Sequence, residues 1–430
     1  MKLLILASLI LSGPLQAATT IQFWHSMSGP KAKVIDQLVA DFNARAENKG
    51  KAEVVAQYVG SYPEGVNKLR TALIGNRGPH VAQIYDIGTQ VMIDSNAVVP
   101  LHEFTSKDPS FAAEQLLPQI RRYYEVAGKL YSLPFATSNP IIYYNVDAFE
   151  KAGLKSPPKT FAELQMACPK LTDAKKQKTC ITWPLHAWFF EEFVARQGGE
   201  LLFPANGRTA RAEKALYSEP PGQRFVSLWK TLVDKGEFAN VGRGWQPANH
   251  NFLADRSAMM ITSTSDVFEI TNKASFRVMT APLFTFDPAV PGGTVVGGNS
   301  LWILKRKQKE EEQLAYSFVR FMASPSVQES WHRNTGYFPI RQDVIDSLKA
   351  KGFYKKYPGA WTAIEQLRSS AEIPATQGAL MGVFPQAREY IESAVEEVLA
   401  GQKAVEKALK DAEDRTNKAL ERYNRLKQHG

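Results

Sequence analysis

Small polar residues, glycines and tyrosines recur where predicted strands end along this chain of 430 residues. Six stretches show the pattern: GSY (60–62), YDIGT (85–89), ATSNP (136–140), TSTS (262–265), GGNS (297–300) and TGYFP (335–339). Their hydroxyls, phenols and free backbone N–H groups donate hydrogen bonds to oxygen atoms, as a pocket for a polyol phosphate requires. Each stretch alone is more typical of an ordinary turn. Their recurrence favours one binding pocket assembled from loops.

One carboxylate and three tryptophans add to this set. Asp86 has the chemistry to accept hydrogen bonds from sugar or glycerol hydroxyls. Trp183, Trp188 and Trp245 are candidates to cover a carbon skeleton. Trp188, in the stretch HAWFFEEF, fits simple packing inside an amphipathic helix equally well.

Arg388 stands in an unusual place within GVFPQAREYIESAVEEVLAG (382–401). Pro385 predicts the start of a helix, and apolar residues at helical spacing predict one buried face. Arg388 then lies in the first turn, where the partial positive charge of a helix N-terminus disfavours a cation. One explanation is an ion pair with Glu389 or Glu392, which contributes little if exposed. The other is that Arg388 and the free N–H groups bind the same anion.

Patterns typical of enzymes are missing from the sequence. It contains no HExxH, GxSxG or P-loop, no GxGxxG after a strand and no cysteines at zinc spacing, and its seven histidines are dispersed. We therefore expect no enzymatic activity, no metal and no cofactor. A catalytic set assembled from distant residues remains the alternative.

The N-terminus predicts export. MKLLILASLILSGPLQA has a lysine, an apolar core and a small-residue end, so residues 1–17 are predicted to be a signal peptide. Cys168 and Cys180, the two cysteines of the chain, are expected to form a local disulfide in an oxidising compartment; a single catalytic thiol is the less favoured alternative. The net charge of +9 comes from short, scattered clusters, whereas a nucleic-acid surface concentrates its charge. No nucleic-acid partner is expected.

The elements that must position these residues alternate between strand and helix. Over the first 150 residues we predict strands at 20–27, 52–60 and 80–87 and helices at 31–46 and 64–76, and hence a mainly parallel sheet. The stretch PFATSNPIIYYN (134–145), with a polar run between two prolines, predicts a crossing into a second lobe. Further helices are expected near 160–171, 187–197 and 222–235, strands within 256–270 and 294–305, and mostly helix from about 308.

Several ordered motifs resemble the extracellular solute-binding proteins of bacterial ABC importers. They include FWHSM (23–27) and PFATSNPIIYYNVDAFEKAGLKSPPKTFAEL (134–164), and the match covers essentially the whole mature chain. IYDIGT, VVGGNSLWI, WHRNTGYFPI and GVFPQAR are similar to the members that bind glycerol phosphates. The resemblance implies an α/β chain with the type II periplasmic-binding-protein fold, in which two lobes close by a hinge on a ligand cleft. We expect lobe 1 to comprise 18–137 plus about 266–325, and lobe 2 to comprise 138–265 plus about 326–430.

The family's ligand-binding residues transfer motif by motif. They fall on Tyr62, Asp86, Ser138, Ser263, Gly298, Tyr337 and Arg388, with Thr264 or Ser265 as alternatives to Ser263. Asp86 replaces a glutamate of the family. The family's pair of tryptophans spaced W-x-x-W is not preserved, because WPLHAW places Trp183 and Trp188 five apart, and Trp188 is the one that aligns.

The resemblance thus implies a periplasmic, monomeric receptor without enzymatic activity. It would bind sn-glycerol-3-phosphate or a glycerophosphodiester such as glycerophosphocholine and deliver it to permease subunits in the inner membrane, driven by a cytoplasmic ATPase. Arg388 would be the main phosphate contact. The alternatives are a receptor of the same fold for maltose or another sugar and, less favoured, a periplasmic phosphodiesterase.

Overall fold

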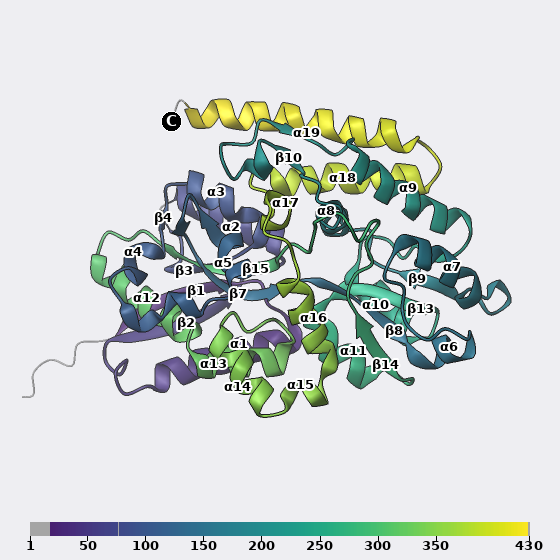
Figure 1. The fold of residues 1–430 in the computed structure, drawn as a ribbon. Helices are drawn as coiled ribbons and strands as arrows, with labels where there is room; N and C mark the ends of the chain where they lie inside the picture. The colour runs from purple at the N-terminus through teal and green to yellow at the C-terminus, as the bar shows by residue number, and fades with distance from the viewer. Residues whose placement is uncertain (1–17, 76, 429–430) are drawn as a thin grey trace, which may run out of the picture.

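The computed structural model describes residues 18–75 and 77–428; the predicted signal peptide, residues 1–17, lies outside these ranges. Two α/β lobes lie side by side, each built on its own sheet (Figure 1). None of the described helices has the length and apolarity needed to cross a membrane. The predicted fold class, two α/β lobes, is confirmed.

The first sheet has the strand order β2-β1-β3-β15-β4, and β7 also pairs with β15. The strands are β1 (Thr19–His25), β2 (Ala52–Tyr58), β3 (Val81–Tyr85), β4 (Val98–Val99), β7 (Leu133–Ser138) and β15 (Gly297–Leu304). β1 pairs in parallel with β2 and β3, as the βαβ rhythm predicts. β15 is antiparallel to β3, β4 and β7, because it enters this sheet from the other lobe. The sheet is therefore mixed rather than mainly parallel.

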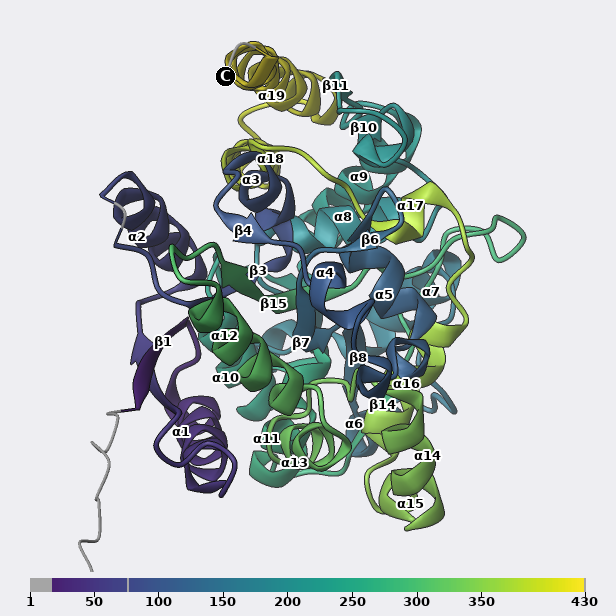
Figure 2. The same cartoon turned by 90° about the vertical axis from the view of Figure 1, so that its left-hand side faces the viewer.

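Alternate residues of β1 face opposite sides, and this places helices on both faces of the sheet. The ring of Phe23 lies 5.2 Å from that of Phe318, whereas Trp24 faces Lys68 on the opposite side. Figure 2 shows α1 and α2 on either side of β1. The helices of this lobe are α1 (Gly29–Ala44), α2 (Tyr62–Ile74), α3 (Thr89–Asp94), α4 (His102–Thr105), α5 (Pro118–Tyr124), α12 (Lys309–Met322), α13 (Pro325–Thr335) and α14 (Gln342–Ala350).

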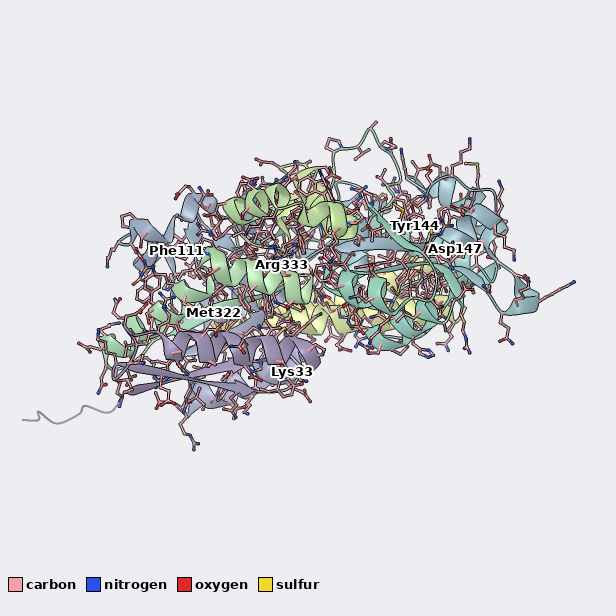
Figure 3. All side chains as sticks on the ribbon, turned by 90° about the horizontal axis from the view of Figure 1, so that it is seen from below. Lys33, Phe111, Tyr144, Asp147, Met322 and Arg333 are labelled. Carbon is pink, nitrogen blue, oxygen red and sulfur yellow. A yellow bond between two sulfur atoms is a disulfide. The ribbon has the colours of Figure 1, made fainter. Side chains whose placement is uncertain are left out.

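The second sheet has the order β12-β9-β13-β8-β14. The strands are β8 (Pro140–Asn145), β9 (Thr179–Thr182), β12 (Phe238–Ala239), β13 (Ser257–Ser263) and β14 (Val278–Ala281). The helices of this lobe are α6 (Val146–Lys151), α7 (Phe161–Leu171), α8 (Ala187–Ala195), α9 (Pro220–Asp234), α10 (Trp245–Leu253), α11 (Val267–Lys273) and α16 (Pro358–Arg368). Seen from below, Tyr144 and Asp147 mark this lobe, and Lys33 and Met322 mark the first (Figure 3).

The predicted crossing between lobes is present at Asn139. β7 ends at Ser138 in the first sheet and β8 begins at Pro140 in the second. Asn139 is fully buried, its side chain donates to the Thr294 hydroxyl at 3.3 Å, and its carbonyl accepts from the Thr264 N–H at 2.9 Å. Since residues 282–296 lead from β14 back to β15, this contact ties two interlobe connections together.

Two helices at the C-terminus lie along the top of the molecule in Figure 1: α18 (Phe384–Leu399), which the sequence predicts, and α19 (Val405–Gln428). The shorter helices α15 (Phe353–Lys356) and α17 (Pro374–Gln377) lie in the connections before them, and the hairpins β5 (Glu125–Val126)–β6 (Lys129–Leu130) and β10 (Leu202–Phe203)–β11 (Lys214–Ala215) lie outside the two sheets. α18 packs against α8 and α9, and α19 packs against α18.

Four elements lie in the other lobe from the one that the predicted division gives them: α11 and β14 belong to the second lobe, and α13 and α14 belong to the first. β14 falls inside the 266–325 range expected for lobe 1, yet it pairs with β8 in the second sheet. From β13 the chain crosses through α11 to the far side of β8, where β14 pairs antiparallel with β8 before the chain leaves that lobe. All of α13 except its first residue, Pro325, falls inside the 326–430 range expected for lobe 2, yet α13 packs on α1.

The structure joins Cys168 at the end of α7 to Cys180 in β9 by a disulfide. Both residues are fully buried, and they lie 12 positions apart in the sequence, so the bond closes a short loop. It fixes the strand that leads into Trp183 and α8 against the helix before it.

Candidate functional site

A cavity of about 750 Å³ lies between the lobes, and all eight sequence-predicted ligand residues line it. Six of them come from the polar turns, one from α8 and one from α18: Tyr62, Asp86, Ser138, Ser263, Gly298, Tyr337, Trp188 and Arg388. Of the two alternatives to Ser263, Ser265 lines it too, whereas Thr264 is buried and does not. The six turns, distant in sequence, therefore meet at one place.

The turns meet because each lies where a strand or a helix begins or ends at the interlobe face. Asp86 opens the 3₁₀ helix η1 (Asp86–Gly88) directly after β3. Ser138 is the last residue of β7, and Ser263 ends β13 and caps the 3₁₀ helix η6 (Thr264–Asp266) by accepting from the N–H of Ser265. Tyr62 opens α2.

Tyr62 is held in a fixed orientation from two sides. Its hydroxyl accepts a hydrogen bond from the Asn299 amide at 2.8 Å, and its ring stacks on Tyr85 with the centroids 5.6 Å apart. Burial raises the pKa of the Tyr62 phenol well above its ordinary value. The phenol therefore stays protonated and can donate to a ligand oxygen.

Glycine is required at two neighbouring positions of β15. Gly298 has φ of +114°, and a Cβ there would lie 1.8 Å from the Ala136 carbonyl oxygen. At Gly297 a Cβ would lie 2.7 Å from the indole of Trp188. The missing side chains let β15 approach β7 and let Trp188 lie flat on the cleft wall.

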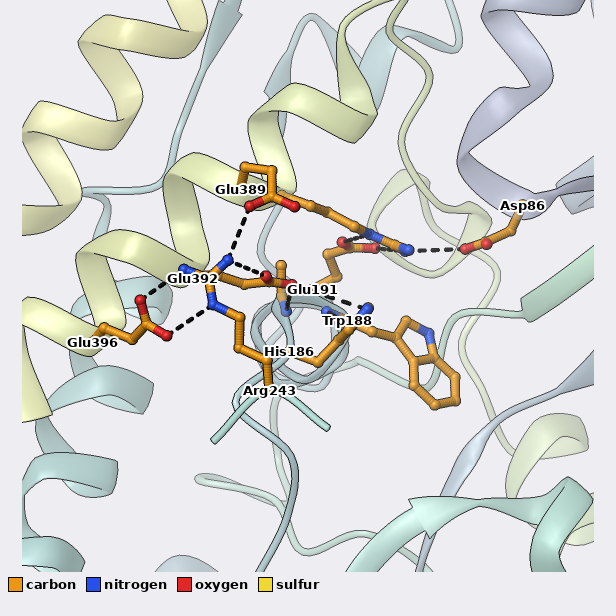
Figure 4. A network of polar contacts seen from close by, with 10 residues as sticks. Asp86, His186, Trp188, Glu191, Arg243, Glu389, Glu392 and Glu396 are labelled. Atoms are coloured by element: carbon orange, nitrogen blue, oxygen red, sulfur yellow. Dashed lines mark hydrogen bonds and ion pairs between the residues drawn. The ribbon is translucent and has the colours of Figure 1, made fainter. Parts of the chain in front are cut away.

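Arg388 is enclosed by two buried carboxylates. Its Nε donates to Glu191 Oε1 at 2.6 Å and its Nη2 donates to Glu191 Oε2 at 2.9 Å and to Asp86 Oδ2 at 3.0 Å. Figure 4 shows Asp86 and Glu191 approaching the same guanidinium from two sides. Nη1 has no hydrogen-bond partner among the described residues, so two N–H groups remain for a ligand.

Two ionised carboxylates on one guanidinium leave a formal charge of −1 among buried side chains. Burial raises the pKa of Asp86, and Arg388 offsets only part of the increase. Burial raises the pKa of Glu191 as well, and Asp86 adds to it by repulsion. The cluster therefore takes up a proton at a higher pH than an isolated carboxylate does.

A second group of polar residues surrounds Lys31 at the start of α1. Its ammonium donates to the Ser265 hydroxyl at 3.0 Å, lies 3.6 Å from Asp266 Oδ1 and stands 4.9 Å over the Tyr337 ring. The hydroxyls of Ser263 and Ser265 are 3.0 Å apart. A cation, two serines and a tyrosine thus meet where α1 of one lobe faces η6 of the other.

Aromatic rings form another part of the wall. The rings of Trp188 and Trp245 lie 5.8 Å apart, and His186 lies 5.3 Å from Trp245. Burial, followed by the charges of two arginines, lowers the pKa of His186 to about 3, so this imidazole is neutral at physiological pH. Trp183 does not line the cleft: it is fully buried and packs against Trp229 and other rings of the second lobe.

The helix α18 carries the charges beside these rings. Arg243 donates to Glu389 at 2.9 Å, to Glu392 at 3.0 Å and to Glu396 at 2.6 Å, and Figure 4 shows it facing all three. The sequence suggested Glu389 or Glu392 as ion-pair partners of Arg388, but Arg243 is the cation that binds them. Arg388 points instead toward Glu191 and Asp86.

Sequence reasoning missed four charged residues: Glu191, Lys31, Arg243 and Asp266. Adjacent glutamates in HAWFFEEF gave one available signal, since both sit in a stretch that is otherwise apolar and must be buried. Lys31 and Arg243 lie in ordinary polar surroundings with no such signal. No group of three metal-ligating side chains occurs within residues 18–75 and 77–428.

Comparison with known proteins agrees with this architecture. The family model of bacterial extracellular solute-binding proteins matches residues 37–362. The chain is 33% identical over 425 residues to the sn-glycerol-3-phosphate-binding periplasmic protein UgpB of Escherichia coli strain K12, covering 97% of this chain and 96% of that protein. The corresponding protein of Salmonella typhimurium is 32% identical over 426 residues, covering 97% and 96%.

Solved structures share the fold. The structure of UgpB from Mycobacterium tuberculosis in complex with glycerophosphocholine gives a TM-score of 0.79 at 22% identity, covering 94% of this chain and 99% of that one. The sugar-binding protein MalE of Xanthomonas citri gives 0.78 at 20% identity, covering 96% and 100%. These likenesses establish the type II periplasmic-binding-protein fold.

Proposed function

This chain belongs to the bacterial extracellular solute-binding proteins, and we propose that it captures a glycerol phosphate in the periplasm for an ABC importer. The observation that carries the proposal is the convergence of all eight predicted ligand residues on one interlobe cavity. The relatives that match nearly the whole chain are named for binding sn-glycerol-3-phosphate.

The cleft supplies the groups that such a ligand needs. Tyr62, Asp86 and Ser138 orient the glycerol hydroxyls. Arg388 offers Nη1 to the phosphate, and Ser263, Tyr337 and the backbone near Gly298 add further donors. Charged donors make hydrogen bonds to phosphate oxygens stronger than neutral donors do.

The charges of the cleft favour a phosphodiester that carries a cationic group. Arg388 forms ion pairs with two carboxylates, and Arg243 forms ion pairs with three. A monoester phosphate carries close to two negative charges at pH 7, whereas a diester carries one. Trp188 and Trp245, whose rings lie 5.8 Å apart on the cavity wall, form a surface suited to a quaternary ammonium. We therefore place a headgroup such as choline on this wall.

Delivery follows the pattern of the family. We propose that the protein acts as a monomer, closes its lobes around the ligand and passes it to permease subunits in the inner membrane, which a cytoplasmic ATPase drives. It performs no chemistry on the ligand in this role. Incubation with glycerophosphocholine should therefore release no choline, and release would point to the phosphodiesterase alternative.

The competing receptor function is the binding of maltose or another neutral sugar, since MalE shares the fold. A thermal-shift panel separates the two. Glycerophosphocholine and sn-glycerol-3-phosphate should raise the melting temperature with concentration, because a ligand that binds only the folded state stabilises it. Maltose and inorganic phosphate should not. A shift with maltose alone would overturn the proposal.

A further inference from the structure

Lys31 is a cation of the cleft that neither the turn pattern nor the family resemblance indicates. Its ammonium bonds to the Ser265 hydroxyl at 3.0 Å and stands over the Tyr337 ring. Ser263, which our proposal assigns to the phosphate, lies 3.0 Å from Ser265. Lys31 therefore contacts the same two loops that are expected to hold the phosphate.

Lys31 is also the least compensated of the three cations that line the cavity. Arg388 donates to two carboxylates and Arg243 to three, all at 3.0 Å or less. The nearest carboxylate oxygen to Lys31 belongs to Asp266 and lies 3.6 Å away, beyond a good hydrogen bond. An ammonium has three N–H donors, and Ser265 takes one.

From this geometry we infer that Lys31 is a phosphate-binding residue of the cleft and exchanges Asp266 for the phosphate when the ligand enters. The inference rests on the proposed function, since it needs a phosphate ester in the cleft. A phosphate oxygen in contact with the ammonium gains a charge-assisted hydrogen bond in a partly buried place, where charges are screened less than at the surface.

One other role fits the same contacts. Lys31 lies in the first turn of α1 in the first lobe and Asp266 belongs to η6 in the second, so the pair could simply hold the lobes together. The two roles predict opposite effects of removing the Asp266 charge. If the pair holds the lobes together, removing the Asp266 charge removes their attraction and weakens the binding of every ligand. If Asp266 instead competes with the phosphate for Lys31, the same change removes the competitor and leaves phosphate binding unchanged or stronger.

The variants can be made with little disturbance. Asp266 Oδ2 accepts from Thr262 at 3.0 Å and from Asn249 at 3.4 Å, while Oδ1 faces Lys31. Asp266→Asn can keep the contacts with Thr262 and Asn249 through its carbonyl, and besides the Lys31 contact it gives up only the long contact in which the Ser265 hydroxyl donates to Oδ1 at 3.4 Å. Lys31→Gln shortens a partly exposed side chain. Lys33→Gln, on the exposed side of α1, is the matched control for loss of one positive charge.

The test is calorimetric titration of the full mature chain and these variants with glycerophosphocholine. We expect Lys31→Gln to weaken binding by about 10-fold to 100-fold, the range for a hydrogen bond to a charged group. Lys33→Gln should bind within about threefold of the wild type. Asp266→Asn should bind as tightly as the wild type or more tightly.

Unchanged affinity of Lys31→Gln, or equal losses in Lys31→Gln and Asp266→Asn, would overturn the assignment of Lys31. If the wild type itself bound neither glycerophosphocholine nor sn-glycerol-3-phosphate, the proposed function would fail instead. The two failures are therefore distinguishable in the same set of titrations.

Discussion

Arg388 on α18 and Glu191 on α8 form two parallel hydrogen bonds, of 2.6 and 2.9 Å, in the buried wall of the cleft. A planar guanidinium matches a carboxylate in this bidentate way, so the pair fixes the direction of the remaining N–H groups. Asp86 accepts from the same guanidinium across the cleft, at 3.0 Å. Arg388, the predicted phosphate contact, is thus held in position by the carboxylate of Glu191, which also offsets its positive charge.

Replacement of Arg388 tests its role in binding. Arg388→Ala should weaken glycerophosphocholine binding by about 2 kcal/mol or more, because a charged hydrogen-bond donor is lost. It should also lower stability by about 3 kcal/mol, since Asp86 and Glu191 remain buried without their cation. Calorimetric titration and denaturant unfolding measure the two effects. Unchanged affinity in a folded variant would remove Arg388 from the binding site.

The charge of Glu191 should set the preference between esters. Glu191→Gln keeps an acceptor for Arg388 but removes one negative charge from the cluster. We expect the affinity for sn-glycerol-3-phosphate to rise relative to that for glycerophosphocholine by about tenfold at pH 7.5, where the monoester carries close to two charges. Ratios of dissociation constants measured side by side give the answer, and an unchanged ratio would show that Glu191 only positions Arg388.

Sequence reasoning predicted the loops of the site better than its charges. The crossing at Asn139 could be predicted because two prolines bracket a polar run. The turns could be predicted because glycine and serine are typical turn residues. The pairing of Arg388 with Glu191 joins residues 197 apart in sequence, and no local pattern encodes such a contact. The pattern around Arg388 suggested nearby glutamates, because helical spacing shows only neighbours on the same helix.

The tryptophans show a related limit. Trp183 and Trp188 lie in the same short stretch, and their spacing does not predict which of them lines the cleft and which packs in the core. The structure buries Trp183 against Trp229 and leaves Trp188 on the cavity, because the chain turns at Pro184 and His186 before α8 begins. Similarly, β14 joins the second sheet through tertiary pairing that its short sequence does not specify.

Glu192 should make stability depend on pH. Burial raises the pKa of this fully buried carboxyl well above its ordinary value, and the N–H of Val295, which donates at 3.0 Å, offsets only part of the increase. Glu191 and Asp86 oppose its ionisation, and Arg196 favours it. The folded state then binds a proton that the unfolded state has released, so stability falls as pH rises from about 4.5 through the raised pKa.

Glu192→Gln removes this titration and keeps an acceptor for Val295. The free energy of unfolding of the variant should exceed that of the wild type by about 1–3 kcal/mol at pH 8, and the difference should shrink toward pH 5. Urea unfolding across that range measures both curves. A wild-type curve as flat as that of the variant would contradict the expectation.

The disulfide should contribute to stability and not to binding. Replacing Cys168 and Cys180 together by alanine should lower the free energy of unfolding by about 3 kcal/mol at most, because the closed loop is short. Neither sulfur lines the cavity. Affinity for glycerophosphocholine should therefore stay within a factor of about two below the melting transition. A large loss of affinity in the folded variant would show that α7 and β9 position the cleft through this bond.

The central claim is that the cleft recognises a glycerol phosphate, and direct titration of the wild-type protein tests it. We predict saturable one-to-one binding of glycerophosphocholine, measured by calorimetry, that an excess of maltose leaves unchanged and an excess of sn-glycerol-3-phosphate weakens by competition. Saturable binding of maltose, with no heat from either phosphate ester, would contradict the account.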